Sequence, residues 1–221
     1  LGNAPIEKEM SQQGQDRMTK FAFIFPGQGS QFIGMGKDLA EAYPQAQEVF
    51  EAVDAALHQD LSMLIWEGSE EELKLTANTQ PALMAVSVAA MRALQAEGVG
   101  PEKAAFVAGH SLGEYSALAA SGAIELADAA RILRIRGNAM QAAVPPGEGA
   151  MAALLGATPE QAVALCELGR AEGGVCEIAN DNAPGQIVIS GSKAAIELAA
   201  SKTGEVGIKK AMMLPVSAPF H

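Results

Sequence analysis

Cysteine and long apolar runs are both scarce in this sequence. Its 221 residues include two cysteines, Cys166 and Cys176, which form no Cys-x-x-Cys pair. Two cysteines do not make a disulfide scaffold, so we expect a reducing compartment and predict a cytoplasmic protein. No apolar run approaches the roughly 18 residues of a membrane span, so we expect no membrane association.

Basic residues are also in short supply. The chain has 15 Lys and Arg against 26 Asp and Glu, a formal net charge of −11. This balance argues against nucleic acid and anionic lipid as the main partner, because both attract positively charged surfaces. A hydrophobic content of 49% with 19% charged residues is typical of a globular protein. The length is sufficient for one domain, or for one domain with an insertion.

The most informative stretch is an apolar run at 104–108, followed by GHSLG at 109–113 and small residues at 117–120. This order predicts a strand, a sharp turn and a helix that ends at Gly122. In a Gly-x-Ser-x-Gly turn the glycines avoid Cβ clashes, and the serine hydroxyl is held clear of the backbone. We therefore predict Ser111 as a nucleophile; the alternative is a glycine-rich structural turn with an idle serine.

Two neighbours of Ser111 receive different roles. Leu112 lies at the start of the predicted helix, where its backbone N–H can point at an oxyanion formed when the hydroxyl attacks a carbonyl. His110 precedes Ser111 on an extended segment, so its side chain should project to the opposite side. We predict an oxyanion donor at Leu112 and a structural histidine at His110.

A second glycine-containing loop follows the buried strand predicted at 21–25. Its Gly-x-Gly at 27–29 resembles the opening of a dinucleotide fingerprint, but Phe32 occupies the third glycine position. We therefore predict no nucleotide site. Instead, we expect the loop to direct a backbone N–H, that of Gln28, at the site made by Ser111.

Helical periodicity covers much of the remaining chain. We predict one amphipathic helix at 39–57, a helix that follows NTQP at 78–81 and runs to about 97, and a third helix at 125–143, with a packed link at 61–66 and an acidic turn at 67–72. Proline then lies in the first turn of the second helix. Gln80, at the head of that helix, either reaches a pocket or caps the helix, and capping is favoured.

The three arginines of the third predicted helix differ in their position relative to its apolar stripe. On a helical wheel Arg136 borders the apolar stripe, Arg134 lies to the side, and Arg131 points away. An unpaired guanidinium among apolar side chains has a heavy desolvation cost, so Arg136 needs an anion. An internal Asp or Glu is one candidate. The functional alternative is a substrate carboxylate held by two parallel hydrogen bonds.

The chain past 146 changes character. Strand patterns at 150–155, 175–179, 186–190 and 208–214 alternate with helices that begin after Thr158 and Ser192. Thr158 and Gln161 have the spacing of a capping box. The order βαββαβ predicts a ferredoxin-like module at 147–213 inserted into the larger domain.

A general base for Ser111 must come from one of three histidines. His58 closes a predicted helix and is expected to be solvated, and His110 is expected to be structural. His221, at the end of PVSAPFH, is the one left. Spacing alone does not bring Ser111 and His221 together, so their pairing is a hypothesis.

Six segments, in order, carry a family resemblance. They are MTKFAFIFPGQGSQ from Met18, NTQPALM from Asn78, GHSLGEYSALAASG from Gly109, RILRIRGNAMQ from Arg131, NDNAPGQIVISG from Asn180 and PVSAPFH from Pro215. Together they resemble the malonyl-CoA:acyl carrier protein transacylases of bacterial fatty acid synthesis. The resemblance implies an α/β fold with an α/β-hydrolase-like catalytic domain, 18–146 and 214–221, and a ferredoxin-like small domain, 147–213. Residues 1–17, polar and aperiodic, resemble an expression leader and are expected to be disordered.

The resemblance also implies site residues. They are Ser111 as nucleophile, His221 as base, Arg136 for the malonyl carboxylate, and Gln28 and Leu112 as oxyanion-hole amides. Gln28 and Gln80 join Arg136 as substrate-binding candidates. No metal or cofactor is implied, because coenzyme A enters as a thioester substrate.

The implied reaction moves a malonyl group from coenzyme A to the phosphopantetheine thiol of acyl carrier protein through an ester on Ser111. The implied partners are malonyl-CoA and holo acyl carrier protein, and we expect a monomer. Because the carrier is acidic, a basic patch is expected near the entrance. Lys209 and Lys210 are candidate contributors, although ordinary surface lysines are the simpler interpretation.

Alternative functions remain at this point. One is a related polyketide acyltransferase or a serine hydrolase that uses water as acceptor. Another is a truncated, non-catalytic module that still binds the carrier. The family continues beyond the PFH motif, and that part supplies the group that orients the histidine, so no residue of this chain can be named for that role.

Overall fold

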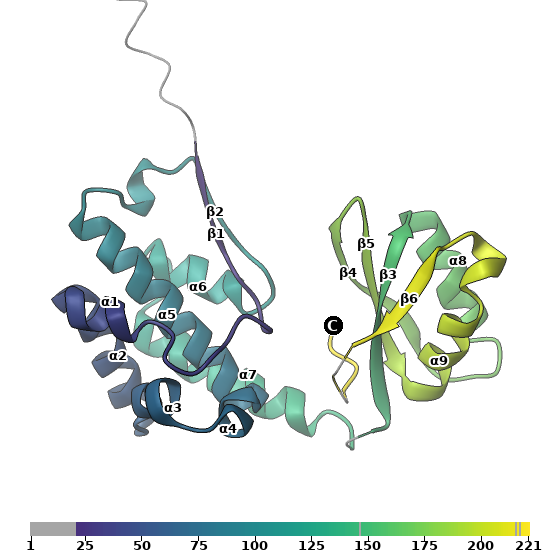
Figure 1. The fold of residues 1–221 in the computed structure, drawn as a ribbon, viewed down its shortest axis with the longest axis horizontal. Helices are drawn as coiled ribbons and strands as arrows, with labels where there is room; N and C mark the ends of the chain where they lie inside the picture. The colour runs from purple at the N-terminus through teal and green to yellow at the C-terminus, as the bar shows by residue number, and fades with distance from the viewer. Residues whose placement is uncertain (1–20, 146, 215, 217) are drawn as a thin grey trace, which may run out of the picture. The chain divides into compact units, whose positions relative to one another are not determined.

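The computed structural model describes residues 21–145, 147–214, 216 and 218–221. The predicted leader at 1–17 lies outside these residues. The chain divides into two compact units, Leu1–Ile135 (unit 1) and Arg136–His221 (unit 2). Figure 1 shows their helices and strands, and the fold is α/β. No helix among the residues described has the length and apolar character needed to span a bilayer.

Unit 1 is built around one long helix. Its helices are α1 (Lys37–Ala42), α2 (Pro44–Leu57), α3 (Leu61–Glu67), α4 (Glu70–Lys74), α5 (Thr76–Ala96) and α6 (Gly113–Ala120), with a 3-10 turn at Pro101–Lys103. The helix α7 (Leu126–Ala142) begins in this unit, and the boundary between the units falls within it. Met84 and Val88 of α5 are fully buried in the same core as Phe50 of α2 and Leu133 of α7.

Two of the predicted boundaries in unit 1 are wrong. The single helix expected at 39–57 is broken at Tyr43, whose backbone is extended at φ −127° and ψ 113°. Pro44 causes the break, because its ring disfavours a helical backbone at the preceding residue. The expected link and acidic turn contain the short helices α3 and α4, and the Ser69 side chain caps α4 by accepting from the N–H of Glu72.

The start of α5 also differs from the prediction. The helix begins at Thr76, so Pro81 lies inside it rather than in its first turn. A proline inside a helix removes one i→i−4 hydrogen bond and crowds the carbonyl four residues earlier. Here the side chains of the first turn supply other bonds: Thr79 Oγ1 donates to the carbonyl oxygen of Leu75 at 3.1 Å.

The sheet of unit 1 has two parallel strands in the part of the chain described, β1 (Ala22–Phe25) and β2 (Phe106–Gly109). Phe25 pairs with Gly109 at their carboxyl ends. One face packs on α6, where Phe25 shares a small core with Ala117 and Ala120. On the other face Ile24 is 79% exposed and Phe106 is 74% exposed.

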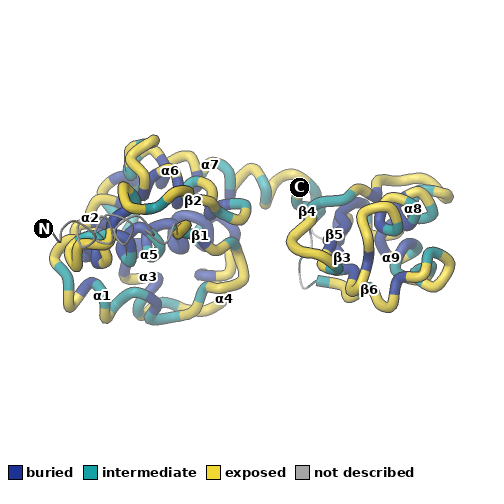
Figure 2. The backbone as a smooth tube through the Cα atoms, turned by 90° about the horizontal axis from the view of Figure 1, so that it is seen from above, coloured by how far each residue is buried: buried dark blue, intermediate teal, exposed yellow. Residues whose placement is uncertain are grey.

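Unit 2 contains an antiparallel sheet covered by two helices. Its elements are β3 (Gly149–Ala157), α8 (Pro159–Gly169), β4 (Cys176–Ala183), β5 (Gly185–Ser192), α9 (Lys193–Ser201), a 3-10 turn (Thr203–Val206) and β6 (Lys210–Met213). The strand order is β4-β5-β3-β6. This confirms the predicted βαββαβ succession. Ile187 and Ile189 of β5 are fully buried against α8 and α9. Figure 2 colours most residues of β3 and β5 as buried.

Candidate active site

The turn between β2 and α6 holds Ser111 in an unusual backbone conformation. Its φ is 55°, in the left-handed region that residues with a side chain rarely adopt. Such strain persists only where the surrounding structure enforces it, and it is common at functional sites. Ser111 therefore has the conformation expected of a serine on a sharp strand-to-helix turn.

The two glycines of the motif are required by close packing. A Cβ on Gly109 would lie 1.9 Å from the carbonyl carbon of Gly113, across the turn. A Cβ on Gly113 would lie 2.4 Å from the carbonyl oxygen of Phe25, at the end of the neighbouring strand. Neither position can hold a side chain unless the backbone moves, which confirms the prediction that glycine must flank the serine.

The two predicted oxyanion donors come from loops at one end of the unit 1 sheet. Because β1 and β2 are parallel, the loop that carries Gln28 and the turn that carries Ser111 leave from the same edge. Leu112 directly precedes α6, so its N–H is among the first N–H groups of that helix, which lack an intrahelical acceptor. The Gln28 side chain reaches α5, where its Nε2 donates to Thr76 Oγ1 at 3.4 Å.

His110 joins these two loops. Its backbone N–H donates to the carbonyl oxygen of Phe25 at 3.0 Å. Its ring lies against Gly27, where a Cβ would come within 2.4 Å of His110 Nδ1. The histidine therefore has a packing role between β1 and β2, as the sequence predicts.

Gln80 is not at the head of its helix. It is the fifth residue of α5, and only 1% of its surface is exposed. The expectation that Gln80 caps this helix is therefore wrong, because α5 starts well before Pro81. Its assignment to substrate binding stays a prediction.

Unit 2 brings two of the predicted site residues together. Arg136 and His221 line one pocket of about 300 Å³, which is completed by Met140, Ala143, Ala218, Pro219 and Phe220. The tail that carries His221 packs on the start of β3, where a Cβ on Gly149 would lie 2.2 Å from Pro219 Cδ. Arg136 and His221 thus line one hollow whose volume exceeds that of a small acyl group.

Met140 and Phe220 were not predicted as site residues. The helix predicted at 125–143 has one apolar stripe, and Met140 belongs to that stripe. Its spacing of four from Arg136 was the signal that both side chains lie on one face of α7. Phe220 had no signal beyond its place beside His221.

Ser111 belongs to unit 1, whereas Arg136 and His221 belong to unit 2. The pairing of Ser111 with His221 stays a prediction. Among the side chains described, no group of three or more His, Cys, Asp or Glu is arranged to hold a metal ion.

Comparison with known proteins gives consistent results. The model of the acyl transferase domain family matches residues 22–214. The malonyl CoA-acyl carrier protein transacylase of Bacillus subtilis (strain 168) is 51% identical over 204 residues, covering 92% of this chain and 63% of the relative. The protein of the same name from Escherichia coli (strain K12) is 50% identical over 204 residues, covering 92% of this chain and 65% of the relative.

Solved structures agree with these relatives. An acyl-carrier-protein-S-malonyltransferase from Bartonella henselae has a TM-score of 0.86 at 57% identity, covering 91% of this chain and 64% of that one. A type II PKS acyl-carrier protein in complex with its malonyl-transacylase gives a TM-score of 0.85 at 43% identity, covering 91% and 64%. The chain thus spans a little under two thirds of the length of the relatives it matches. From the extent of these matches we conclude that it belongs to the acyl transferase domain family.

Proposed function

We propose that this chain carries the acyl-transfer site of a malonyl-CoA:acyl carrier protein transacylase. The observation that carries the proposal is the strained serine on its glycine-flanked turn, at φ 55°. The shared pocket of Arg136 and His221 supports it, as do the names of the relatives. In this proposal Ser111 is the nucleophile and His221 is the general base.

The first half-reaction forms an ester. His221 takes the proton of the Ser111 hydroxyl, and the serine oxygen attacks the thioester carbonyl of malonyl-CoA. The N–H groups of Leu112 and Gln28 stabilise the oxyanion, and loss of one such donor typically costs about 10²- to 10³-fold in rate. Collapse of the intermediate breaks the C–S bond, and coenzyme A leaves with a proton.

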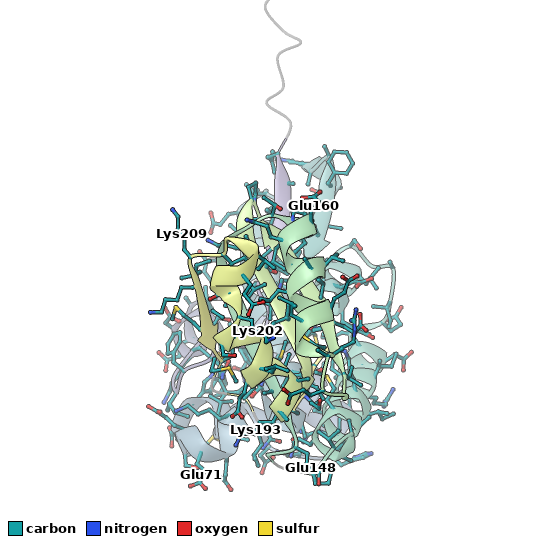
Figure 3. The ribbon with its side chains drawn as sticks, turned by 90° about the vertical axis from the view of Figure 1, so that its right-hand side faces the viewer. Glu71, Glu148, Glu160, Lys193, Lys202 and Lys209 are labelled. Atoms are coloured by element: carbon teal, nitrogen blue, oxygen red, sulfur yellow. The ribbon has the colours of Figure 1, made fainter. Side chains whose placement is uncertain are left out.

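The second half-reaction transfers the group. The phosphopantetheine thiol of the carrier attacks the ester carbonyl, with His221 taking its proton and returning one to Ser111. Coenzyme A is a substrate in this scheme, and no cofactor takes part. The acidic carrier needs a basic surface, to which Lys209 and Lys210 contribute in this proposal; Figure 3 shows the Lys209 side chain pointing outward from the ribbon.

Arg136 selects the acyl group. Its guanidinium holds the malonyl carboxylate by two parallel hydrogen bonds. An acetyl group would leave that charge unpaired in the pocket, and sites built around a polar contact reject the analogue that lacks it. Gln80 and the side chain of Gln28 complete the substrate-binding set.

The proposal extends to the domains and the setting. The domain at 18–146 and 214–221 is α/β-hydrolase-like, and the module at 147–213 is ferredoxin-like, which the strand order β4-β5-β3-β6 supports. We propose a cytoplasmic monomer whose partners are malonyl-CoA and holo acyl carrier protein.

Mass spectrometry of the intact chain after incubation with malonyl-CoA tests this function. We expect one malonyl adduct that peptide mapping assigns to Ser111, and none in Ser111→Ala. Addition of holo acyl carrier protein should remove the adduct and malonylate the carrier. Release of free malonate without carrier malonylation would identify a hydrolase instead.

A matched pair of variants on α7 tests the specificity. Arg136→Ala should lose the preference for malonyl-CoA over acetyl-CoA. Arg131→Ala should keep it, because Arg131 is exposed and pairs with Asp128 at 2.8 Å. A malonyl preference that survives in Arg136→Ala would refute the carboxylate assignment.

A further inference from the structure

Arg134 connects three segments of unit 1 that lie far apart in the sequence. Its Nη1 donates to Asn78 Oδ1 at 2.7 Å, and its Nη2 donates to Gln59 Oε1 at 2.5 Å. Asn78 lies in the first turn of α5, and Gln59 lies between α2 and α3. One guanidinium therefore ties α7 to the start of α5 and to the α2–α3 connection.

The partners of this guanidinium are unusual. Both are neutral amide oxygens, and burial lowers the pKa of Arg134 from its ordinary value. Bonds to neutral amides gain less electrostatic energy than an ion pair would, and no carboxylate of the described residues pairs with Arg134. Its forked geometry, however, lets it hold two acceptors at once in fixed directions. The two hydrogen bonds therefore fix the positions of Asn78 and Gln59 more than they add electrostatic stabilisation.

The segment that Arg134 holds needs such support. Pro81 lies inside α5, so the turn before it, 76–80, is coupled to the rest of the helix by one hydrogen bond fewer. Leu75, which precedes the helix, provides no side-chain cap. Asn78 anchors this turn in two directions, since its Nδ2 also donates to the carbonyl oxygen of Glu72 at 2.9 Å.

The same turn contacts the loop of a proposed oxyanion donor. Thr76 Oγ1 accepts from Gln28 Nε2 at 3.4 Å. Thr76 and Asn78 are two residues apart in this turn, so a displacement at Asn78 is transmitted to Thr76 through a single turn of backbone. The contacts therefore run from Arg134 through Asn78 and Thr76 to Gln28, entirely within unit 1.

We infer that Arg134 is a positioning residue: it holds the first turn of α5 in place and, through Thr76, fixes the loop of Gln28. The inference rests on the proposed function, because Gln28 acts there as an oxyanion donor. Since that donor acts on charge that develops in the transition state, its displacement should slow ester formation without weakening substrate binding.

Arg134→Gln and Arg131→Gln form a matched pair for the kinetic test. Both remove one positive charge from α7, but Arg131 is exposed and bonds to Asp128 of its own helix. We expect Arg134→Gln to lower the rate of ester formation at saturating malonyl-CoA about tenfold, since small displacements of catalytic groups have effects of this order or larger. The half-saturating concentration should stay unchanged, and Arg131→Gln should match the parent. A higher half-saturating concentration with an unchanged maximal rate would overturn the inference.

Further variants test whether Arg134 acts through its two hydrogen bonds rather than through its charge. Arg134→Lys keeps the charge but cannot span both amide acceptors, so it should remain slow. Thr76→Val removes the hydrogen bond between Thr76 and Gln28. The rate of ester formation in the double variant with Arg134→Gln should be no lower than in the slower single variant. Full recovery of the rate in Arg134→Lys, or additive effects in the double variant, would contradict the inference.

Nuclear magnetic resonance tests the same chain of contacts without catalysis. The side-chain amide signal of Gln28 should shift in Arg134→Gln and in Thr76→Val, and should not shift in Arg131→Gln. Failure of the parent chain to form an ester would refute the proposed function, whereas the Gln28 signal still decides the positioning role. An unchanged Gln28 signal, with Asn78 signals displaced, would overturn the inference.

Discussion

The two sheets in the described part of the chain differ in how their faces are covered. In unit 2, α8 and α9 cover one face of a four-stranded sheet, and Ile187 and Ile189 are almost entirely removed from solvent. In unit 1, α6 covers one face of β1 and β2, while Ile24 and Phe106 on the other face remain mostly exposed. Parallel strands are normally covered on both faces, whereas among the described residues α6 covers one face of the unit 1 sheet.

The sheet of unit 1 is followed by the strained serine. Ser111 has a left-handed backbone and follows β2 directly. Strain at a functional turn is stable only if close packing around it prevents relaxation. In unit 1 that packing comes from Gly109 and Gly113, which let the turn approach the end of β1. Both units have buried apolar cores, but the turn of Ser111 in unit 1 depends in addition on steric fit.

Native probes report on each unit separately. Trp66, the single tryptophan, packs on Phe50 in unit 1 with ring centroids 5.0 Å apart, so its fluorescence follows that unit. Both cysteines are buried in unit 2. The hydrogen bond with Cys176 and burial raise the pKa of the Cys166 thiol, and the same hydrogen bond lowers that of Cys176. Cys166 should therefore resist alkylation until unit 2 opens.

The largest effect is expected for Gly109→Ala. The new Cβ would overlap the backbone of Gly113, so we expect a loss of more than about 4 kcal/mol in the free energy of unfolding of unit 1. Denaturant titration followed by Trp66 fluorescence measures this loss. A Trp66 transition at the parent midpoint would show that the turn tolerates the side chain.

Ile189→Ala should have the next largest effect, this time in unit 2. Ile189 is fully buried between β5 and the helices, and such truncations typically cost about 2–5 kcal/mol. Alkylation of Cys166 under mild denaturant should become faster, while the Trp66 transition stays in place. An unchanged alkylation rate would mean that the apolar core of unit 2 does not limit its stability.

Thr158→Ala should have a smaller effect on unit 2. Thr158 and Gln161 form a reciprocal capping box at the start of α8, and loss of such a cap costs about 1 kcal/mol. Alkylation of Cys166, which lies in α8, measures the effect. Ser69→Ala, at the start of the five-residue α4, tests the corresponding cap in unit 1 and should show a smaller change by Trp66 fluorescence.

The smallest effect is expected for Ile24→Ala. Because Ile24 is 79% exposed, its truncation should change the stability of unit 1 by no more than about 0.5 kcal/mol. Phe25→Ala, one residue along the same strand, should cost about 3 kcal/mol or more, because Phe25 is buried on the α6 side. Equal effects at the two positions would refute the distinction between the two faces.

Much of this fold is predictable where the determining contacts are local. The capping box at Thr158 and the turn around Ser111 depend on residues within a few positions, and both were predicted. Pro44 also acts locally, but the apolar periodicity of 39–57 continues across it and predicts one helix instead of two. The start of α5 differs from the prediction for another reason. Proline commonly lies in the first turn of a helix, but here the helix begins five residues before Pro81, and the side chains of Asn78 and Thr79 bond to carbonyl oxygens at its start.

The candidate site was predictable only in part. The sequence singled out Arg136 and His221, but their shared pocket depends on how the tail packs against β3. The apolar stripe predicted on α7 is typical of a core-facing surface, yet Met140 lines that pocket. The partners of Arg134 are 56 and 75 residues away, and nothing local to α7 indicates them.

The sequence by itself determined the Gly-x-Ser-x-Gly turn and the βαββαβ order, because short-range sterics and hydrogen bonds specify a turn, a cap and a strand or helix period. Only the tertiary structure decided which face of each sheet is covered, that Arg136 and His221 line the same pocket, and that Arg134 holds the start of α5. Contacts of this kind join residues distant along the chain, and they exist only once the cores of the two units have formed.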